Sequence, residues 1–126
     1  MKRERGFTLI ELLVVIAIIG VMAALVIVNL SSANRKSRDS RRKADLAEVK
    51  TALELYYDDE MGYPTGDYDD LDGTITPEYI KTLPQDPRDG ADYYYSYTSD
   101  GDEYTLNATL ENAEEGEEIY TVYSSN

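Results

Sequence analysis

An unbroken apolar segment near the N-terminus constrains the fold of this chain more than any other feature. Residues 12–28 carry no polar side chain, and residues 7–28 would form a helix of roughly 33 Å at about 1.5 Å per residue, enough to cross the hydrocarbon core of a bilayer. A secretory signal peptide has a shorter apolar region, and as a buried helix of a soluble domain residues 12–28 would leave no polar face to meet water. The segment therefore predicts a membrane-spanning helix.

One carboxylate, Glu11, interrupts the apolar composition of this segment. A charged side chain at the centre of a membrane-spanning helix costs on the order of 3 kcal/mol on insertion scales, so an unpaired glutamate needs a partner or a route to water. Glu11 lies near the start of the segment, where a long side chain can extend to the lipid headgroups. The position alone leaves both explanations open.

The residues around Glu11 form a motif. A basic leader, MKRER, precedes Gly6 and Phe7, and TLIE follows, so that Glu11 is the fifth residue after Gly6. This N-terminus resembles that of type IV prepilins and of the pseudopilins of type II secretion. The resemblance implies that a prepilin peptidase cleaves between Gly6 and Phe7 on the cytoplasmic side and that Phe7 is then N-methylated. It also implies that the Glu11 carboxylate pairs with the N-terminal amine of a neighbouring subunit.

Charge divides the chain into two unlike halves. Residues 1–50 contain 10 Lys and Arg against 5 Asp and Glu, residues 51–126 contain 2 against 20, and the net charge of the whole chain is −13. The sequence has no histidine and no cysteine, which excludes disulfides, zinc sites built on those side chains and His-based nucleophilic triads. We therefore expect no enzymatic activity.

The residues after the apolar segment predict a continuation of the same helix. No proline or glycine occurs between Gly20 and Gly62, so the sequence predicts one helix from about residue 7 to residue 60, ended by the Gly-Tyr-Pro sequence at 62–64. Its second half is amphipathic, because apolar side chains recur at a spacing of three to four residues: Leu46, Val49, Leu53, Tyr56 and Tyr57.

The C-terminal part predicts three strands. The dipeptide Asp100-Gly101 separates two segments rich in strand-forming residues, as in a hairpin, and residues 119–125 predict a third strand. An antiparallel sheet of these strands, packed on the amphipathic helix, would bury four apolar side chains, Leu53, Tyr57, Leu106 and Leu110.

Two short motifs lie between the helix and the first strand. Thr76 and Pro77 suit the N-cap and the first position of a single helical turn. The sequence LPQDP at 83–87 resembles the LPxDP loop between helix and sheet in the major pseudopilin of type II secretion.

The fold expected from these elements is α+β, a type IV pilin-like lollipop in which one long N-terminal helix packs on a small antiparallel three-stranded sheet. We expect four parts: a leader peptide at residues 1–6, a membrane-spanning and polymerisation helix at 7–30, an amphipathic continuation of the helix at 31–62, and an acidic globular head at 63–126.

A basic cluster follows the apolar segment and comprises Arg35, Lys36, Arg38, Arg41, Arg42 and Lys43. Basic runs can neutralise phosphates, but this one has no interleaved aromatic residues and belongs to a strongly acidic chain, so nucleic acid is not expected as a direct ligand. We expect the cluster to pair with acidic heads of neighbouring subunits. Its charge would place the C-terminal part in the cytoplasm by the positive-inside rule, whereas the resemblance places the N-terminus there.

A second cluster is acidic and comprises Asp67, Asp69, Asp70 and Asp72. These residues do not fit the ligand spacing of an EF-hand, and the C-terminal calcium loop of the major pseudopilin has no counterpart in this sequence. A solvated acidic surface is the favoured interpretation, with weak calcium binding as the alternative.

The leading hypothesis is therefore a pilin, a precursor held by a single span in the bacterial inner membrane with its N-terminus in the cytoplasm. Prepilin peptidase would process it, and an inner-membrane assembly platform with its ATPase would polymerise it from the lipid phase into an extracellular or periplasm-spanning type IV pilus-like filament. The alternative is the major pseudopilin of a type II secretion system. A hypothesis of a different class is a membrane-anchored acidic module that binds cations or another ligand and never polymerises.

Overall fold

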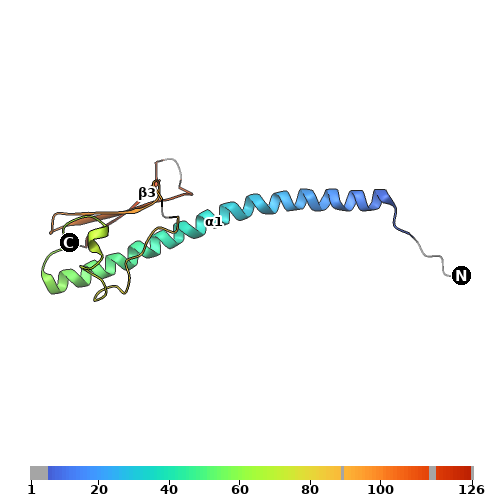
Figure 1. Ribbon diagram of the computed structural model, residues 1–126. Helices are drawn as coiled ribbons and strands as arrows, with labels where there is room; N and C mark the ends of the chain where they lie inside the picture. The colour runs from blue at the N-terminus through green and yellow to red at the C-terminus, as the bar shows by residue number, and fades with distance from the viewer. Residues whose placement is uncertain (1–5, 89, 114–115, 126) are drawn as a thin grey trace. The chain divides into compact units, whose positions relative to one another are not determined.

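The computed structural model describes residues 6–88, 90–113 and 116–125. Figure 1 shows the order of its elements: α1 (Leu9–Glu60), a short 3-10 helix η1 (Asp69–Leu71), β1 (Tyr95–Ser99), β2 (Tyr104–Thr109) and β3 (Ile119–Tyr123). The chain divides into two compact units, Met1–Asn34 and Arg35–Asn126.

In the first unit the expected apolar helix is confirmed. An 18-residue window of α1 near the N-terminus has a mean hydropathy of 3.0, and none of it is buried within the chain. By length and composition this part of α1 is able to cross a membrane. The helix continues through Gly20, where an added Cβ would meet no other atom within 4 Å, so this glycine is not required by packing within the chain.

In the second unit α1 presents one buried stripe to the head. Its buried residues are Asp39, Arg42, Leu46, Val49, Ala52 and Leu53. The apolar members confirm the predicted amphipathic face, and two charged residues extend the same stripe toward the N-terminus at the same three- to four-residue spacing.

The C-terminal end of α1 differs in detail from the sequence prediction. The helix ends at Glu60, and the next residue, Met61, adopts the left-handed conformation with φ 60°. Its N–H donates to the Tyr57 carbonyl at 2.8 Å, as in the αL type of helix termination. The residue that was expected to end the helix, Gly62, instead lies against the Gly101 carbonyl, which an added Cβ would approach to 3.5 Å.

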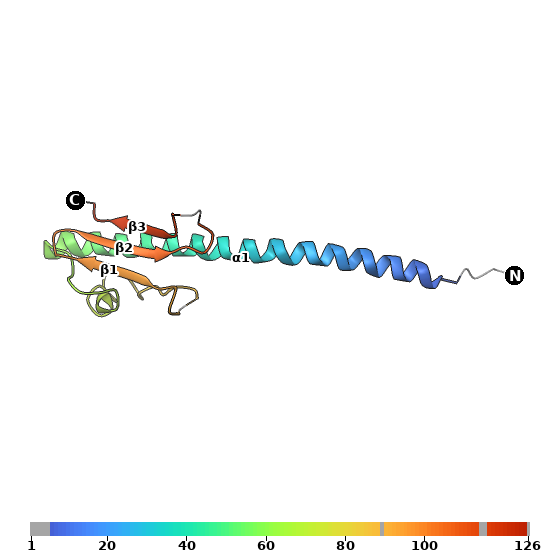
Figure 2. The same cartoon turned by 90° about the horizontal axis from the view of Figure 1, so that it is seen from above.

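The three strands form one antiparallel sheet in the order β1-β2-β3, as predicted. Figure 2 shows the strands side by side over the second half of α1. Residues 100–103 connect β1 to β2. Gly101 has a positive φ of 99° in this loop, and the Asp100 carboxylate accepts the N–H groups of Asp102 and Glu103 at 3.0 and 2.9 Å. These features explain why the Asp-Gly signal marks the hairpin.

The core lies between the buried stripe of α1 and the inner face of the sheet. Leu53 and Leu106 are fully buried, as predicted, whereas Tyr57 is partly buried and Leu110 is half-buried beyond the end of β2. Alternation along β2 buries Tyr104, Leu106 and Ala108 and turns the residues between them outward.

Tyrosine hydroxyls connect the sheet to α1. Tyr95 donates to the Asp45 carboxylate at 2.7 Å, and Tyr104 donates to the Glu54 carboxylate at 3.0 Å. Tyr63, which follows the helix, donates to the other oxygen of Glu54 at 2.9 Å. The rings fill the core while their hydroxyls reach carboxylates at its edge, so these three tyrosines act as core residues with polar ends.

The segment between η1 and the LPQDP loop forms turns, not the predicted helical turn at 77–82. The Thr76–Pro77 peptide bond is cis. The Thr76 hydroxyl does not cap a following helix. It accepts the Gly73 N–H at 2.9 Å and donates to the Asp72 carboxylate at 2.7 Å.

Candidate functional site

The expected processing site precedes the first helix. Gly6 and Phe7 are exposed and lie before the start of α1 at Leu9, and the Phe7 side chain is 81% exposed. The basic residues of the leader, at positions 2, 3 and 5, lie outside the described residues. Since an added Cβ on Gly6 would meet nothing within 4 Å, the chain's own packing does not require glycine at this position.

Glu11 closes the N-terminal end of α1. Its Oε2 accepts the Thr8 backbone N–H at 2.9 Å and the Thr8 hydroxyl at 2.6 Å. In return the Thr8 hydroxyl oxygen accepts the Glu11 N–H at 3.4 Å. This reciprocal pattern is a capping box, in which the N-cap threonine and the glutamate three residues later satisfy each other's helix-end groups.

The capping box is a role of Glu11 that the sequence analysis missed, although TLIE fits the S/T-x-x-E signature of such a box. It also explains how a lone glutamate is accommodated in an apolar segment. Both bonds from Thr8 end on Oε2, so the second carboxylate oxygen takes no part in the box. A cation that approached Oε1 would not have to break the box first.

The basic cluster contributes to a buried ion network in the second unit. The Arg42 side chain is 0% exposed. Its Nε and Nη2 donate to Oδ2 and Oδ1 of Asp86 at 2.6 and 2.8 Å, and its Nη1 donates to Asp39 Oδ1 and to Glu111 Oε1, both at 2.8 Å. The expectation that this cluster pairs with neighbouring subunits is therefore wrong for Arg42.

Glu111 joins two further arginines to this network. Arg38 donates from Nε and Nη2 to the two Glu111 oxygens at 2.7 and 2.6 Å, so the expectation of pairing between subunits is wrong for Arg38 as well. Arg88 Nη1 lies 3.4 Å from Glu111 Oε2. We call this set the Arg42 network: Arg38, Asp39, Arg42, Asp86, Arg88 and Glu111.

The Arg42 network is electrically balanced, with three arginines against three carboxylates. Hydrogen bonds from Arg38, and then from Arg42, lower the pKa of Glu111 to about 2 although burial opposes the shift. Burial alone would raise the pKa of Asp86, but the Arg42 guanidinium outweighs it and the pKa is lowered. The bond from Arg42 to Asp86 likewise raises the pKa of the guanidinium. Glu111, Asp86 and Arg42 are therefore charged at neutral pH.

A tyrosine ring, that of Tyr93, lies close to two of these arginines. Arg42 Cζ is 4.9 Å from the centroid of the Tyr93 ring, and Arg88 Cζ is 4.6 Å from it. Within the described residues every buried side-chain nitrogen and oxygen has a hydrogen-bond partner. The network thus ties α1, the LPQDP loop and Glu111, the second residue after β2, into one satisfied cluster, which is a structural role.

Carboxylates of the acidic cluster accept hydrogen bonds within the turns in which they lie. Asp67 Oδ1 accepts the N–H groups of Asp69 and Asp70, at 3.2 and 3.3 Å, and Asp70 Oδ2 accepts the Asp67 N–H at 3.1 Å. The Asp72 carboxylate accepts a hydrogen bond from the Thr76 hydroxyl. Over the described ranges, no group of three or more His, Cys, Asp or Glu side chains is arranged to hold a metal ion.

Known proteins are similar to this chain at its N-terminal motif and along most of its length. Residues 1–27 match the model of the prokaryotic N-terminal methylation motif. The chain is 36% identical over 118 residues to the type II secretion system core protein G of Vibrio cholerae, and the aligned region covers 84% of this chain and 78% of that protein. This chain belongs to the core protein G family of type II secretion.

Other relatives agree with this assignment. The core protein G of Klebsiella pneumoniae is 40% identical over 106 residues, covering 74% of each chain. The core protein G of Escherichia coli is 38% identical over 103 residues, covering 72% of this chain and 70% of that protein. No solved structure matches the chain.

Membership of the core protein G family changes the order of the functional hypotheses. The sequence alone favoured a type IV pilus-like filament over the secretion pseudopilin, and the relatives support the pseudopilin better. The predicted resemblance to pseudopilins and the α+β fold with one long helix and a three-stranded sheet are both confirmed. The apolar helix and the motif fit a membrane-anchored precursor.

Proposed function

We propose that this chain is a structural subunit of the filament of a type II secretion system. The observation that carries the proposal is the match to core protein G along 84% of the chain, which is far more than the N-terminal motif at residues 1–27. The subunit performs no catalysis. Its partners are copies of itself, a prepilin peptidase, and the inner-membrane assembly platform with its ATPase.

In this proposal the precursor spans the inner membrane once, with residues 1–6 in the cytoplasm. Cleavage after Gly6 creates an N-terminal amine on Phe7, which is then methylated, and the processed chain leaves the lipid phase to join a filament that extends into the periplasm. The exposed position of Gly6 and Phe7 before α1 supports access of a peptidase to this bond.

The proposed role of Glu11 is to receive the Phe7 amine of a neighbouring subunit. A carboxylate and an ammonium each lose hydration in a low-dielectric environment, and pairing offsets that loss only in one register. The capping box supports this role because it holds the Glu11 carboxylate at the first turn of α1 through a single oxygen. Thr8 then orients the carboxylate in the free subunit.

Processing is tested by the intact mass of the protein purified from the membrane fraction. The expected mass is that of the chain from Phe7 onward with one added methyl group. Gly6→Leu is the matched variant, because the open space at Gly6 allows the larger side chain within the chain itself, and it should retain residues 1–6. A wild-type protein that keeps these residues would contradict the proposal at its first step.

The role of Glu11 is tested by filament yield. Glu11→Gln keeps the size of the side chain and removes the charge, so processing and membrane insertion should persist. The equilibrium constant for adding a subunit should fall at least about tenfold if the pair contributes 1.4 kcal/mol or more. Glu48→Gln, an exposed carboxylate further along α1, is the control. Equal yields of the two variants would rule out the pairing.

A further inference from the structure

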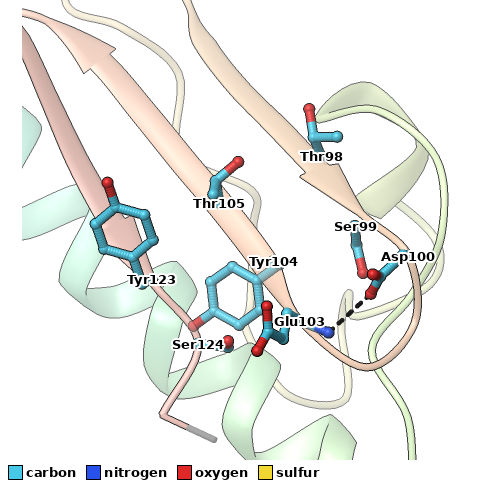
Figure 3. Close-up of a pocket in the computed structure, with 8 residues that line it drawn as sticks. All are labelled: Thr98, Ser99, Asp100, Glu103, Tyr104, Thr105, Tyr123 and Ser124. Carbon is cyan, nitrogen blue, oxygen red and sulfur yellow. Dashed lines mark hydrogen bonds between the residues drawn. The ribbon is translucent and has the colours of Figure 1, made fainter.

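β3 is an outer strand of the sheet, in which the order is β1-β2-β3. Just after β3, the Ser124 N–H donates to the Tyr104 carbonyl of β2 at 3.2 Å, and Figure 3 shows both residues at this end of the sheet. Ladder bonds in an antiparallel pair recur at every second residue, so the backbone groups of the alternate residues of β3 face away from β2. These residues are Ile119, Thr121 and Tyr123.

The two outer strands differ in what lies beside them. The segment that contains η1 lies next to β1, where the Tyr68 ring is 5.6 Å from the Tyr95 ring (Figure 2). Next to β3, the described part of the chain outside the sheet contributes no backbone hydrogen bond to residues 119–123. We call the outward backbone groups of residues 119–123 the open edge. Such an edge is a template on which a strand of another chain can pair.

Two copies of the open edge would match each other. In an antiparallel pair with its two-fold axis at Thr121, that residue faces its own copy, and Ile119 of each copy faces Tyr123 of the other. Each facing pair would exchange N–H···O bonds in both directions. The side chains of Ile119 and Tyr123 are 64% and 63% exposed, so the pairing would also bury apolar surface. The free strand therefore carries a risk of pairing between heads.

Side chains of α1 close one end of the open edge. Lys50 Nζ donates to the Tyr123 carbonyl at 3.0 Å. One turn later, Glu54 Oε1 accepts the Ser125 N–H at 3.2 Å. The Tyr123 carbonyl is the acceptor that the Ile119 N–H of a second copy would need, so two copies could pair fully only after Lys50 had left the carbonyl in both chains.

A lysine is well suited to this position. A strand that approached the open edge would have to remove water from the ammonium group as well as break its bond, and lysines are common at the free edges of sheets for this reason. We propose that Lys50 keeps the open edges of two chains from pairing. Subunits that are crowded together then associate through other surfaces, and their sheets stay separate.

The test places the full chain in phospholipid nanodiscs at one copy per disc, so that discs can join only through their heads. Sedimentation velocity measures whether the discs are single or paired. Lys50→Met keeps the length of the side chain and removes the ammonium. The dissociation constant of the disc pair should fall at least about tenfold, because each pair gains two hydrogen bonds that Lys50 prevents. Lys50→Ala should give the same result.

Two matched variants should remain single. Lys50→Arg keeps a donor for the Tyr123 carbonyl. Lys43→Met removes a charge from the same flank of α1, where Lys43 Nζ lies 5.2 Å from the centroid of the Tyr120 ring and contacts a side chain instead of a backbone group. The comparison separates the bond to the carbonyl from the general positive charge near β3.

Hydrogen exchange and second substitutions locate the contact. The Thr121 N–H faces away from β2, so its exchange should slow when Lys50→Met discs pair. Thr121→Pro, added to Lys50→Met, should restore single discs, because it removes the central N–H of the pair and no bond to β2 depends on that group. Ile119→Lys, which places a charge on an exposed position of β3, should do the same.

Three outcomes would overturn this inference. Lys50→Met discs that remain single would show that Lys50 only fastens β3 to α1. Lys43→Met discs that pair as tightly would assign the effect to charge alone. Pairing that leaves exchange of the Thr121 amide unchanged, or that survives both second substitutions, would lie on another surface. Because each disc holds one chain, none of these results depends on whether the chain forms a secretion filament.

Discussion

Arg42 and Asp86 are joined by two parallel hydrogen bonds, Nε to Oδ2 at 2.6 Å and Nη2 to Oδ1 at 2.8 Å, and both side chains are almost fully buried. The pair connects the middle of α1 to the LPQDP loop, 44 residues further along the chain. Bidentate geometry of this kind is among the stronger polar interactions in proteins and fixes both partners in orientation as well as distance. The pair thus determines how the loop lies on the helix.

Removal of the Arg42 side chain should be strongly destabilising. Arg42→Ala would leave the carboxylates of Asp86, Asp39 and Glu111 close together without the guanidinium that bonds all three. The loss of one partner of a buried ion pair costs about 3–5 kcal/mol. Chemical unfolding followed by near-ultraviolet circular dichroism of the tyrosines measures the loss.

Arg41→Ala is the matched control for Arg42→Ala. The neighbouring arginine is 65% exposed and lies 3.8 Å from Asp45, so its removal should cost less than about 1 kcal/mol. If the two variants were equally stable, the Arg42 network would not contribute to the stability of the head.

Arg42 also shows where the sequence was informative and where it was not. Its position, four residues before Leu46 and seven before Val49, places it on the apolar stripe of α1, and the pattern of the helix could have indicated that it is buried. Its partners could not be inferred, because Asp86 and Glu111 lie in loops whose path depends on tertiary packing.

Sequence signals that depend on neighbouring residues predicted the structure more reliably than those that depend on tertiary packing. The alternation along β2 and the Asp100-Gly101 turn predicted the hairpin, because each depends on residues close in sequence. The capping box of Thr8 and Glu11 depends on residues three apart, so it could have been predicted from the sequence in the same way. The turn at Thr76 was mistaken for a helix start because threonine followed by proline suits both.

The stability of the head should fall in acid. The pKa of Glu111 is lowered from 4.5 to about 2 in the folded state, so its charged form stabilises the fold fully above pH 4.5 and this contribution is lost as the pH falls toward 2. Thermal unfolding measured at intervals from pH 6 to pH 2 should show a decreasing transition temperature below about pH 4.5. Glu111→Gln should start from a lower stability and show a shallower decrease. An identical acid profile for the variant would assign the effect to other carboxylates.

Alkaline pH should destabilise the head through the tyrosines near Glu54. Burial, together with the hydrogen bond to Glu54, raises the pKa of Tyr63 to about 12 and raises the pKa of Tyr104 as well. A raised pKa means that the stabilisation is complete below the ordinary value of 10 and is lost as the pH rises through 12. Spectrophotometric titration of tyrosinate should show a late group of tyrosines that ionises together with unfolding.

Glu54→Gln separates the two causes of this shift. The variant keeps the burial of both rings and removes the charge beside their hydroxyls, so the late tyrosines should ionise at a lower pH, though still above 10. If the late group were unchanged in this variant, burial alone would account for it.

Chelation of divalent cations should leave the thermal stability of the chain unchanged. The carboxylates of Asp67, Asp70 and Asp72 accept hydrogen bonds within their own turns, and Glu111 is neutralised by arginines in a network whose charges balance. An ion present at a hundred times its Kd would add about 2.7 kcal/mol, which for a head of this size corresponds to roughly 10–20 °C in Tm. Differential scanning calorimetry with excess EDTA and with millimolar calcium should therefore give the same Tm. A calcium-dependent rise of several degrees that Asp70→Asn abolished would instead locate an ion in the acidic cluster.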